Sequence, residues 1–250
     1  MHDHYTPLPN DVIASAQDCL TTMDESKKMQ QEYNIYFASC IGTLIYLSHT
    51  QPDIIYVVNK LAKYTKFSGE YHMDGLLHLL RYLCGNACVG LMYYSDVSQS
   101  PMHGLLSDNK VNTSSLLITF SDSSWNDDVD NGQSTGAFFI FYMGGIVDHS
   151  SNLPDPIAHS SAESEYNQAC LACMATAHLK MFLNELEGRL DVDGSKVEPI
   201  PVILDNRSAI DMGASYKDMK HTCHIMHHYH YVREGVESRR HILLWIGTKF

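Results

Sequence analysis

Residues 116–125 read Leu-Leu-Ile-Thr-Phe-Ser-Asp-Ser-Ser-Trp, an apolar run that ends at a carboxylate and a tryptophan. The run 116–120 combines apolar, β-branched and aromatic residues, which predicts a buried strand. Asp122 then lies at the end of that strand. Functional side chains gather at strand ends in α/β sheets, so Asp122 is the first candidate for a site residue.

The segments that follow alternate between strand and helix patterns. We predict strands at 136–142 and 145–149 joined by a Gly-Gly turn, a long helix at 162–187, a short buried strand at 201–205, helices near 207–214 and 221–236, and a last strand at 242–246. This order predicts an α/β fold with a mixed sheet flanked by helices. Asp205 falls at the carboxyl end of the fourth predicted strand, so it is the second candidate for a site residue.

The first part of the chain has a different, helical pattern. Residues 1–27 are polar and contain prolines, which predicts an irregular lead-in. Apolar residues then recur at helical spacing in three stretches, so 28–94 is expected to form a small all-helical module. The polar stretch 95–114 is the expected linker, and 115–250 the α/β domain.

Composition narrows the classes of protein. The 250 residues are 44% hydrophobic and 18% charged, which indicates a globular chain. A net charge of −12 argues against a uniformly basic nucleic-acid-binding surface, although it leaves room for a local basic groove. The sequence has no run of about 18 apolar residues, which a membrane span would need, so no membrane partner is expected. Seven widely spaced cysteines predict reduced thiols in a cell interior.

A third carboxylate comes from the segment 160–166, Ser-Ser-Ala-Glu-Ser-Glu-Tyr, at the start of the long helix. Residues two apart on a helix point about 200° apart, so either Glu163 or Glu165 faces a given site, not both. Ser160 and Glu163 match a capping box, which gives Glu163 a structural role. Glu165 is therefore the better site candidate.

Asp122, Glu165 and Asp205 together predict a metal site, because converging carboxylates repel one another unless a divalent cation neutralises them. Oxygen ligands alone suit Mg²⁺ or Mn²⁺, and two such ions about 3.5–4 Å apart can promote phosphodiester hydrolysis. The alternative is that Asp122 and Asp205 cap the turn and the helix that follow them.

Four segments in this order resemble the ribonuclease H domain of copia-type LTR retrotransposon polyproteins: 120–128 (Phe-Ser-Asp-Ser-Ser-Trp-Asn-Asp-Asp), 133–136 (Gln-Ser-Thr-Gly), 160–166 and 204–206 (Leu-Asp-Asn). Upstream, 41–48, 52–54 and 79–83 resemble the segment that joins the reverse transcriptase to the ribonuclease H. The resemblance extends from about residue 6 to 250.

This resemblance implies a ribonuclease H-like fold and a nuclease that cuts the RNA strand of an RNA–DNA hybrid with two Mg²⁺ or Mn²⁺ ions. By motif match, Asp122, Glu165 and Asp205 are the catalytic, metal-binding carboxylates, with Asp122 bridging both ions. It also implies nucleic-acid contacts at Asn206, His224 and Arg233. The implied partner is the remainder of the polyprotein reverse transcriptase, and the implied location is intracellular, in a cytoplasmic virus-like particle or the nucleus.

The chain also departs from the family pattern. The family's fourth carboxylate and final helix would follow residues 245–248, where this chain ends at Phe250, so we expect impaired activity and an apolar sheet face left uncovered. The polymerase's own motifs are absent, since Asp127-Asp128 lies in the ribonuclease H block. Cys223, His227 and His228 stand where the family tends to carry basic residues, which suggests a decaying copy that has lost cationic contacts.

Other interpretations remain open. Lys60, Lys63 and Lys66 lie three apart and are expected to form one basic face, which could bind backbone phosphates or merely be solvated. The His/Cys cluster at 223–228 could hold zinc, whereas Cys170 and Cys173 are expected in the core. The chain as a whole could be a catalytically dead remnant that at most binds nucleic acid, or an unrelated α/β interaction module.

Overall fold

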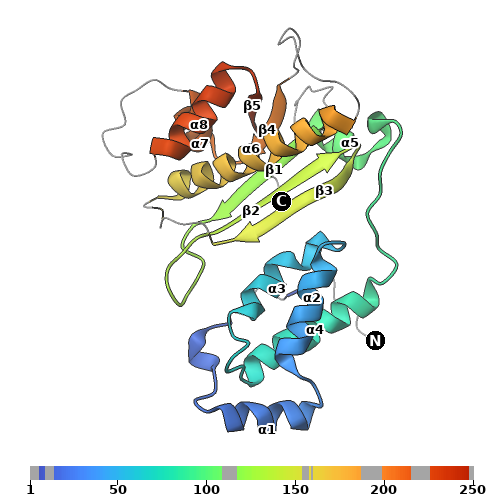
Figure 1. Ribbon diagram of the computed structural model, residues 1–250, viewed down its shortest axis with the longest axis vertical. Helices are drawn as coiled ribbons and strands as arrows, with labels where there is room; N and C mark the ends of the chain where they lie inside the picture. The colour runs from blue at the N-terminus through green and yellow to red at the C-terminus, as the bar shows by residue number, and fades with distance from the viewer. Residues whose placement is uncertain are drawn as a thin grey trace. The chain divides into compact units, whose positions relative to one another are not determined.

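A computed structural model describes residues 6–8, 14–108, 117–153, 158, 160–186, 199–214 and 226–247 of the chain (Figure 1). The chain divides into two compact units. The first contains residues 1–91 with 129–131, and the second contains 92–128 with 132–250. None of the helices in these described segments is long and apolar enough to cross a bilayer.

The first unit is all-helical, as predicted. Its elements are η1 (Ala16–Asp18), α1 (Met23–Tyr33), α2 (Phe37–Ser48), η2 (Pro52–Ile54), α3 (Ile55–Ala62) and α4 (Glu70–Gly85). They share one core of buried apolar residues that includes Phe37, Ile41, Ile54, Val58, Leu61, Met73, Leu76 and Leu79. Pro52 opens η2 at its first position, where a missing N–H costs nothing.

Helix α1 begins inside the stretch that we expected to be irregular. Thr22 caps it, because its hydroxyl accepts a hydrogen bond from the Glu25 amide and the Glu25 carboxylate accepts one from the Thr22 amide. The helix buries little apolar surface, so hydrophobic periodicity missed it, whereas the capping box at 22–25 could have revealed it.

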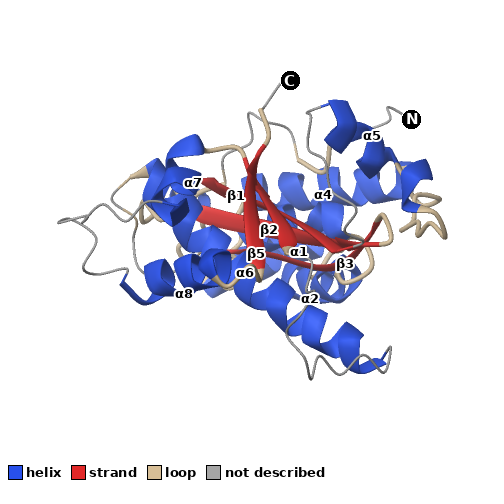
Figure 2. Ribbon diagram, turned by 90° about the horizontal axis from the view of Figure 1, so that it is seen from above, coloured by secondary structure: helices blue, strands red, loops and turns tan. Residues whose placement is uncertain are grey.

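The second unit is built on a five-stranded sheet with the order β3-β2-β1-β4-β5. Its strands are drawn in red in Figure 2. The strands are β1 (Leu117–Ser124), β2 (Thr135–Tyr142), β3 (Gly145–Asn152), β4 (Ile200–Leu204) and β5 (His241–Trp245). Strands β1, β2 and β3 are antiparallel neighbours, while β4 runs parallel to β1 and β5 parallel to β4. This is the mixed sheet that we predicted.

Helix α6 (Ser161–Leu186) packs across one face of this sheet. The Thr176 and Thr119 hydroxyls hydrogen-bond at 2.7 Å, and the Ser164 and Ser123 hydroxyls also pair, so α6 is fixed along β1. Helices α7 (Arg207–Ala214) and α8 (Met226–Glu237) join it around a core of Tyr166, Cys170, Cys173, Val202, Ala209, Met212 and Val232. The two cysteines are therefore core residues, as predicted.

The opposite face of the sheet is partly covered by α5 (Pro101–Asp108). Ile118 and Ile203 point away from α6, because side chains alternate along a strand, and Leu106 of α5 is buried against both. The expectation of an uncovered face is therefore wrong at these positions. Helix α5 and the short η3 (Val97–Gln99) lie within 95–114, the stretch that we predicted as a linker.

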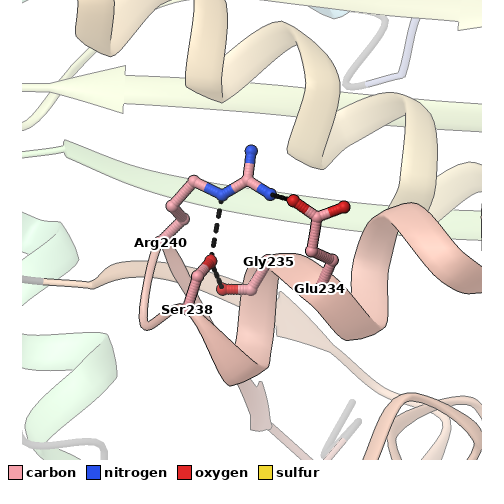
Figure 3. Close-up of polar contacts among 4 residues, drawn as sticks. All are labelled: Glu234, Gly235, Ser238 and Arg240. Atoms are coloured by element: carbon pink, nitrogen blue, oxygen red, sulfur yellow. Dashed lines mark hydrogen bonds and ion pairs between the residues drawn. The ribbon is translucent and has the colours of Figure 1, made fainter.

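A compact corner joins α8 to β5 (Figure 3). Arg240 donates from Nε to the Ser238 hydroxyl at 3.0 Å and from Nη2 to Glu234 at 2.8 Å, while Ser238 donates to the Gly235 carbonyl oxygen. The corner brings His241 against Gly235, where a Cβ would lie only 2.7 Å from the His241 ring. A glycine is thus needed for β5 to begin this close to α8.

Candidate metal centre

Three carboxylates from separate elements converge at one edge of the sheet. Asp122 lies on β1, Glu165 on the first turns of α6, and Asp205 directly after β4. One ligand oxygen from each lies within 4.8 Å of the others. Strands β1 and β4 are parallel neighbours, so their carboxyl ends lie at the same edge and bring Asp122 and Asp205 together. The structure therefore assembles the three residues that the sequence singled out.

The start of α6 determines which glutamate joins them. The Ser160 hydroxyl accepts a hydrogen bond from the Glu163 amide at 3.2 Å, which is the capping interaction that we predicted for this pair. Both glutamates are buried, but the cluster contains Glu165 and not Glu163. The choice made from the helical angle agrees with this placement.

The electrostatics of the cluster follow from its burial. Glu165 is 5% exposed, and this burial, followed by the charges of Asp122 and Asp205, raises its pKa to about 8. Burial and then the charge of Asp122 also raise the pKa of Asp205. Both shifts show that the cluster favours carrying fewer negative charges than its three carboxyl groups would carry in water.

The donor set fits a hard divalent cation. All three groups offer oxygen atoms, which Mg²⁺ and Mn²⁺ prefer. Oε2 of Glu165 is buried and has no hydrogen-bond partner among the described residues, so this residue of the cluster keeps one acceptor unsatisfied. A cation in this position would satisfy that oxygen and remove the repulsion among the carboxylates.

Asn206, Arg233 and His224, which we predicted to contact nucleic acid, do not share one environment. Asn206 caps α7, because its Oδ1 accepts hydrogen bonds from the amides of Ser208 and Ala209 at 2.9 and 3.3 Å. Arg233 lies half-buried on α8, where its charge opposes the rise that burial causes in the pKa of the Tyr166 hydroxyl in the core. His224 and Cys223 lie outside the described residues, as do the side chains of 227 and 228, so the predicted zinc alternative has no described ligands.

The three lysines belong to the helical unit, but they do not share one helix face. Helix α3 ends at Ala62, so Lys63 and Lys66 lie beyond its last turn. Lys60 donates to the Tyr56 hydroxyl at 3.2 Å, and the Lys66 ammonium lies over the Phe67 ring. The expectation of a single basic face is therefore corrected, because the helix ends too early to align all three.

Sequence reasoning missed two residues beside the cluster, Arg207 and Trp245. The Trp245 indole N–H donates to the backbone oxygen of Asp205 at 2.9 Å, and the Arg207 guanidinium lies over the indole ring. The available signal was that Trp245 ends a strand parallel to the one that carries Asp205, which places both at the same edge.

Comparisons with known proteins agree with the motifs. The chain is 27% identical over 244 residues to a retrovirus-related Pol polyprotein from transposon TNT 1-94 of Nicotiana tabacum, a match that covers 97% of this chain and 16% of the relative. It is 29% identical over 202 residues to the corresponding polyprotein from transposon RE1 of Arabidopsis thaliana, covering 81% and 12%. Relatives that match most of this chain thus include Pol polyproteins of plant transposons, and the chain spans less than a fifth of their length.

Searches of family models and solved structures add the following. No family model matches the chain. Similar solved structures include an N-terminal RNase H domain from Mycobacterium tuberculosis, with 10% identity, a TM-score of 0.38, and coverage of 53% of this chain and 82% of that one. They also include LC11-RNase H1 in complex with an RNA/DNA hybrid, with 15% identity, a TM-score of 0.37, and coverage of 53% and 86%.

Proposed function

From the homology to Pol polyproteins, we propose that the α/β unit is a ribonuclease H domain that hydrolyses the RNA strand of an RNA–DNA hybrid. The single observation that carries this proposal is the convergence of Asp122, Glu165 and Asp205 within 4.8 Å. Together with the raised pKa of Glu165, it supports a site in which a bound cation would favour the ionised form of all three groups.

Mg²⁺ or Mn²⁺ fits these oxygen donors, and two ions are proposed because phosphodiester hydrolysis uses a metal on each side of the scissile phosphate. When bound, such ions supply the charge that lowers the pKa of an attacking water and stabilises the departing oxygen. Asp122, Glu165 and Asp205 would hold these ions, with the exposed Asp122 shared between them and Glu165 and Asp205 each contributing to one.

The strength of the activity is part of the proposal. We propose that cleavage by this chain is slow. The alternative is a catalytically dead remnant that at most binds nucleic acid. The remainder of a reverse transcriptase is the proposed partner, and a cytoplasmic virus-like particle or the nucleus is the proposed site of action.

A cleavage assay tests the proposal. The chain is incubated with an end-labelled RNA–DNA hybrid and Mg²⁺ or Mn²⁺, alongside single-stranded RNA and duplex DNA. We expect cleavage of the hybrid RNA by the parent and its loss in Asp205→Asn. Asp211→Asn, which makes the same charge change at an exposed position on α7, should behave like the parent.

Each other outcome has a defined meaning. Equal cleavage by Asp205→Asn and the parent would show that the assigned site is not the catalytic one. Binding of the hybrid with no cleavage in either metal would favour the dead remnant. Absence of both binding and cleavage would favour an unrelated interaction module.

A further inference from the structure

A stacked pair of side chains lies at the edge of the carboxylate cluster. Arg207 is the first residue of α7, and its guanidinium carbon lies 3.8 Å from the centroid of the Trp245 ring. Trp245 is the last residue of β5, and Leu204, its partner in the register of β4, directly precedes Asp205. The pair therefore belongs to the same edge of the sheet as the metal site.

The indole connects this pair to the cluster. Its N–H donates to the backbone oxygen of Asp205 at 2.9 Å, while the Arg207 guanidinium stacks on its ring. A guanidinium stacked on an aromatic ring uses its flat face, so its N–H donors stay directed outward around its rim. Trp245 thus touches both a carboxylate residue of the cluster and a cation beside it.

The Arg207 guanidinium forms no ion pair within the described part of the chain. Arg207 is exposed, its contact there is the Trp245 ring, and it forms no ion pair with the described carboxylates. The guanidinium is therefore held in a fixed place without neutralising the acidic cluster, and its donors face solvent.

We infer that Arg207, stacked on Trp245, binds a backbone phosphate of the nucleic acid whose cleavage is proposed above. The N–H donors of a guanidinium group can hydrogen-bond the oxygens of a phosphate. Such contacts position the duplex without selecting its sequence. The Trp245 hydrogen bond then ties this phosphate contact to the residue that carries the Asp205 carboxylate. The inference rests on the proposed function for its substrate class, and it adds a binding residue outside the three carboxylates.

Hybrid binding measured by fluorescence anisotropy tests it, in EDTA so that no cleavage occurs, across a salt series from about 50 to 200 mM. We expect Arg207→Gln to weaken binding by about tenfold and to reduce the slope of log K against log salt by about one. Arg207→Lys should recover most of the slope, because it restores the charge, and part of the affinity.

Arg239→Gln is the matched control. It removes the same charge from an exposed arginine that precedes β5, at the opposite end of that strand from Trp245. Thermal unfolding of each variant checks that the fold is retained, and Arg207→Lys gives the answer if Arg207→Gln does not fold.

Equal affinity and slope in Arg207→Gln and Arg239→Gln would overturn the inference, as would absence of hybrid binding by the parent. A parent that binds the hybrid but does not cut it would refute the nuclease proposal alone, because the contribution of Arg207 to binding is measured without cleavage.

Discussion

A carboxylate oxygen of Glu165 on α6 lies within 4.8 Å of one from Asp122 on β1. Glu165 is buried, so this approach of like charges is unfavourable in the absence of a cation, and the pKa of Glu165 rises to about 8 from a usual 4.5. The folded chain therefore holds the Glu165 proton more tightly than the unfolded chain does. Two predictions follow from this pair of residues.

Without metal, the α/β unit should lose stability as the pH rises. The contribution of Glu165 is fully present below pH 4.5 and is lost as the pH passes through about 8. We expect Glu165→Gln to remove this loss and to unfold at a higher temperature than the parent at pH 8 in EDTA. Glu185→Gln, on the exposed end of the same helix, should keep the parent's pH dependence. An unchanged slope in Glu165→Gln would contradict the assignment.

Mn²⁺ should stabilise the chain, and more so at pH 8 than at pH 5, because the ligands must lose their protons to bind it. At a concentration about 100-fold above its Kd, an ion adds about 2.7 kcal/mol to the free energy of unfolding. Asp122→Asn should abolish most of this gain, measured as the shift in unfolding temperature. A full shift in that variant would mean that the ions bind elsewhere.

Gly136→Ala should destabilise the α/β unit by about 1–3 kcal/mol. A Cβ at Gly136 on β2 would overlap the Gln168 side chain, which is fully buried on α6. Chemical denaturation measures the loss. Gly104→Ala on α5 has open space around its Cβ and serves as the control, with no loss or a small gain expected. Equal stability of the two variants would show that α6 does not approach β2 this closely.

Leu106→Ala should cost about 2–5 kcal/mol, because Leu106 is 4% exposed and packs against Ile118 and Ile203. Leu105→Ala makes the same change at a neighbour that is 46% exposed and should cost less than about 1 kcal/mol. Denaturant midpoints compare the two. If both variants match the parent, α5 is a linker after all and not part of the core.

His241→Leu should protect the chain against acid. Burial, followed by the charge of Arg240, lowers the pKa of His241 to about 4. The unfolded chain therefore binds this proton first, and stability is lost as the pH falls from about 6.5 toward 4. Between these two pH values, we expect the unfolding temperature of His241→Leu to fall less than that of the parent. His178→Leu, on the exposed side of α6, should behave like the parent. An acid loss identical in both would refute the assignment.

Much of the α/β unit could be predicted because its elements carry local signals. The predicted helix at 162–187 is α6 at Ser161–Leu186, and the predicted strand at 201–205 is β4 at Ile200–Leu204. Apolar runs bounded by turn residues define such elements without any knowledge of their partners. The three carboxylates of the site could be predicted for the same reason, since each lies near the end or the start of one such element.

The missed features depend on contacts between distant segments. Helix α5 is short, and its place is determined by Leu106 packing on Ile118 and Ile203, which no local pattern reveals. The stacking of Arg207 on Trp245 requires the register of β4 with β5. The packing of Gln168 against Gly136 likewise joins α6 to β2, and neither residue type predicts the other.

The central parallel pairing also has a consequence for how the chain folds. Thr119 pairs with Val202 and Phe120 with Ile203, so the hairpins of β1, β2 and β3 can form long before β4 reaches the sheet. Closing so long a loop is slow, and this closure is the step that brings Asp205 to Asp122. During synthesis on the ribosome, the repulsion among the carboxylates is therefore postponed until β1, β2, β3 and α6 have been made.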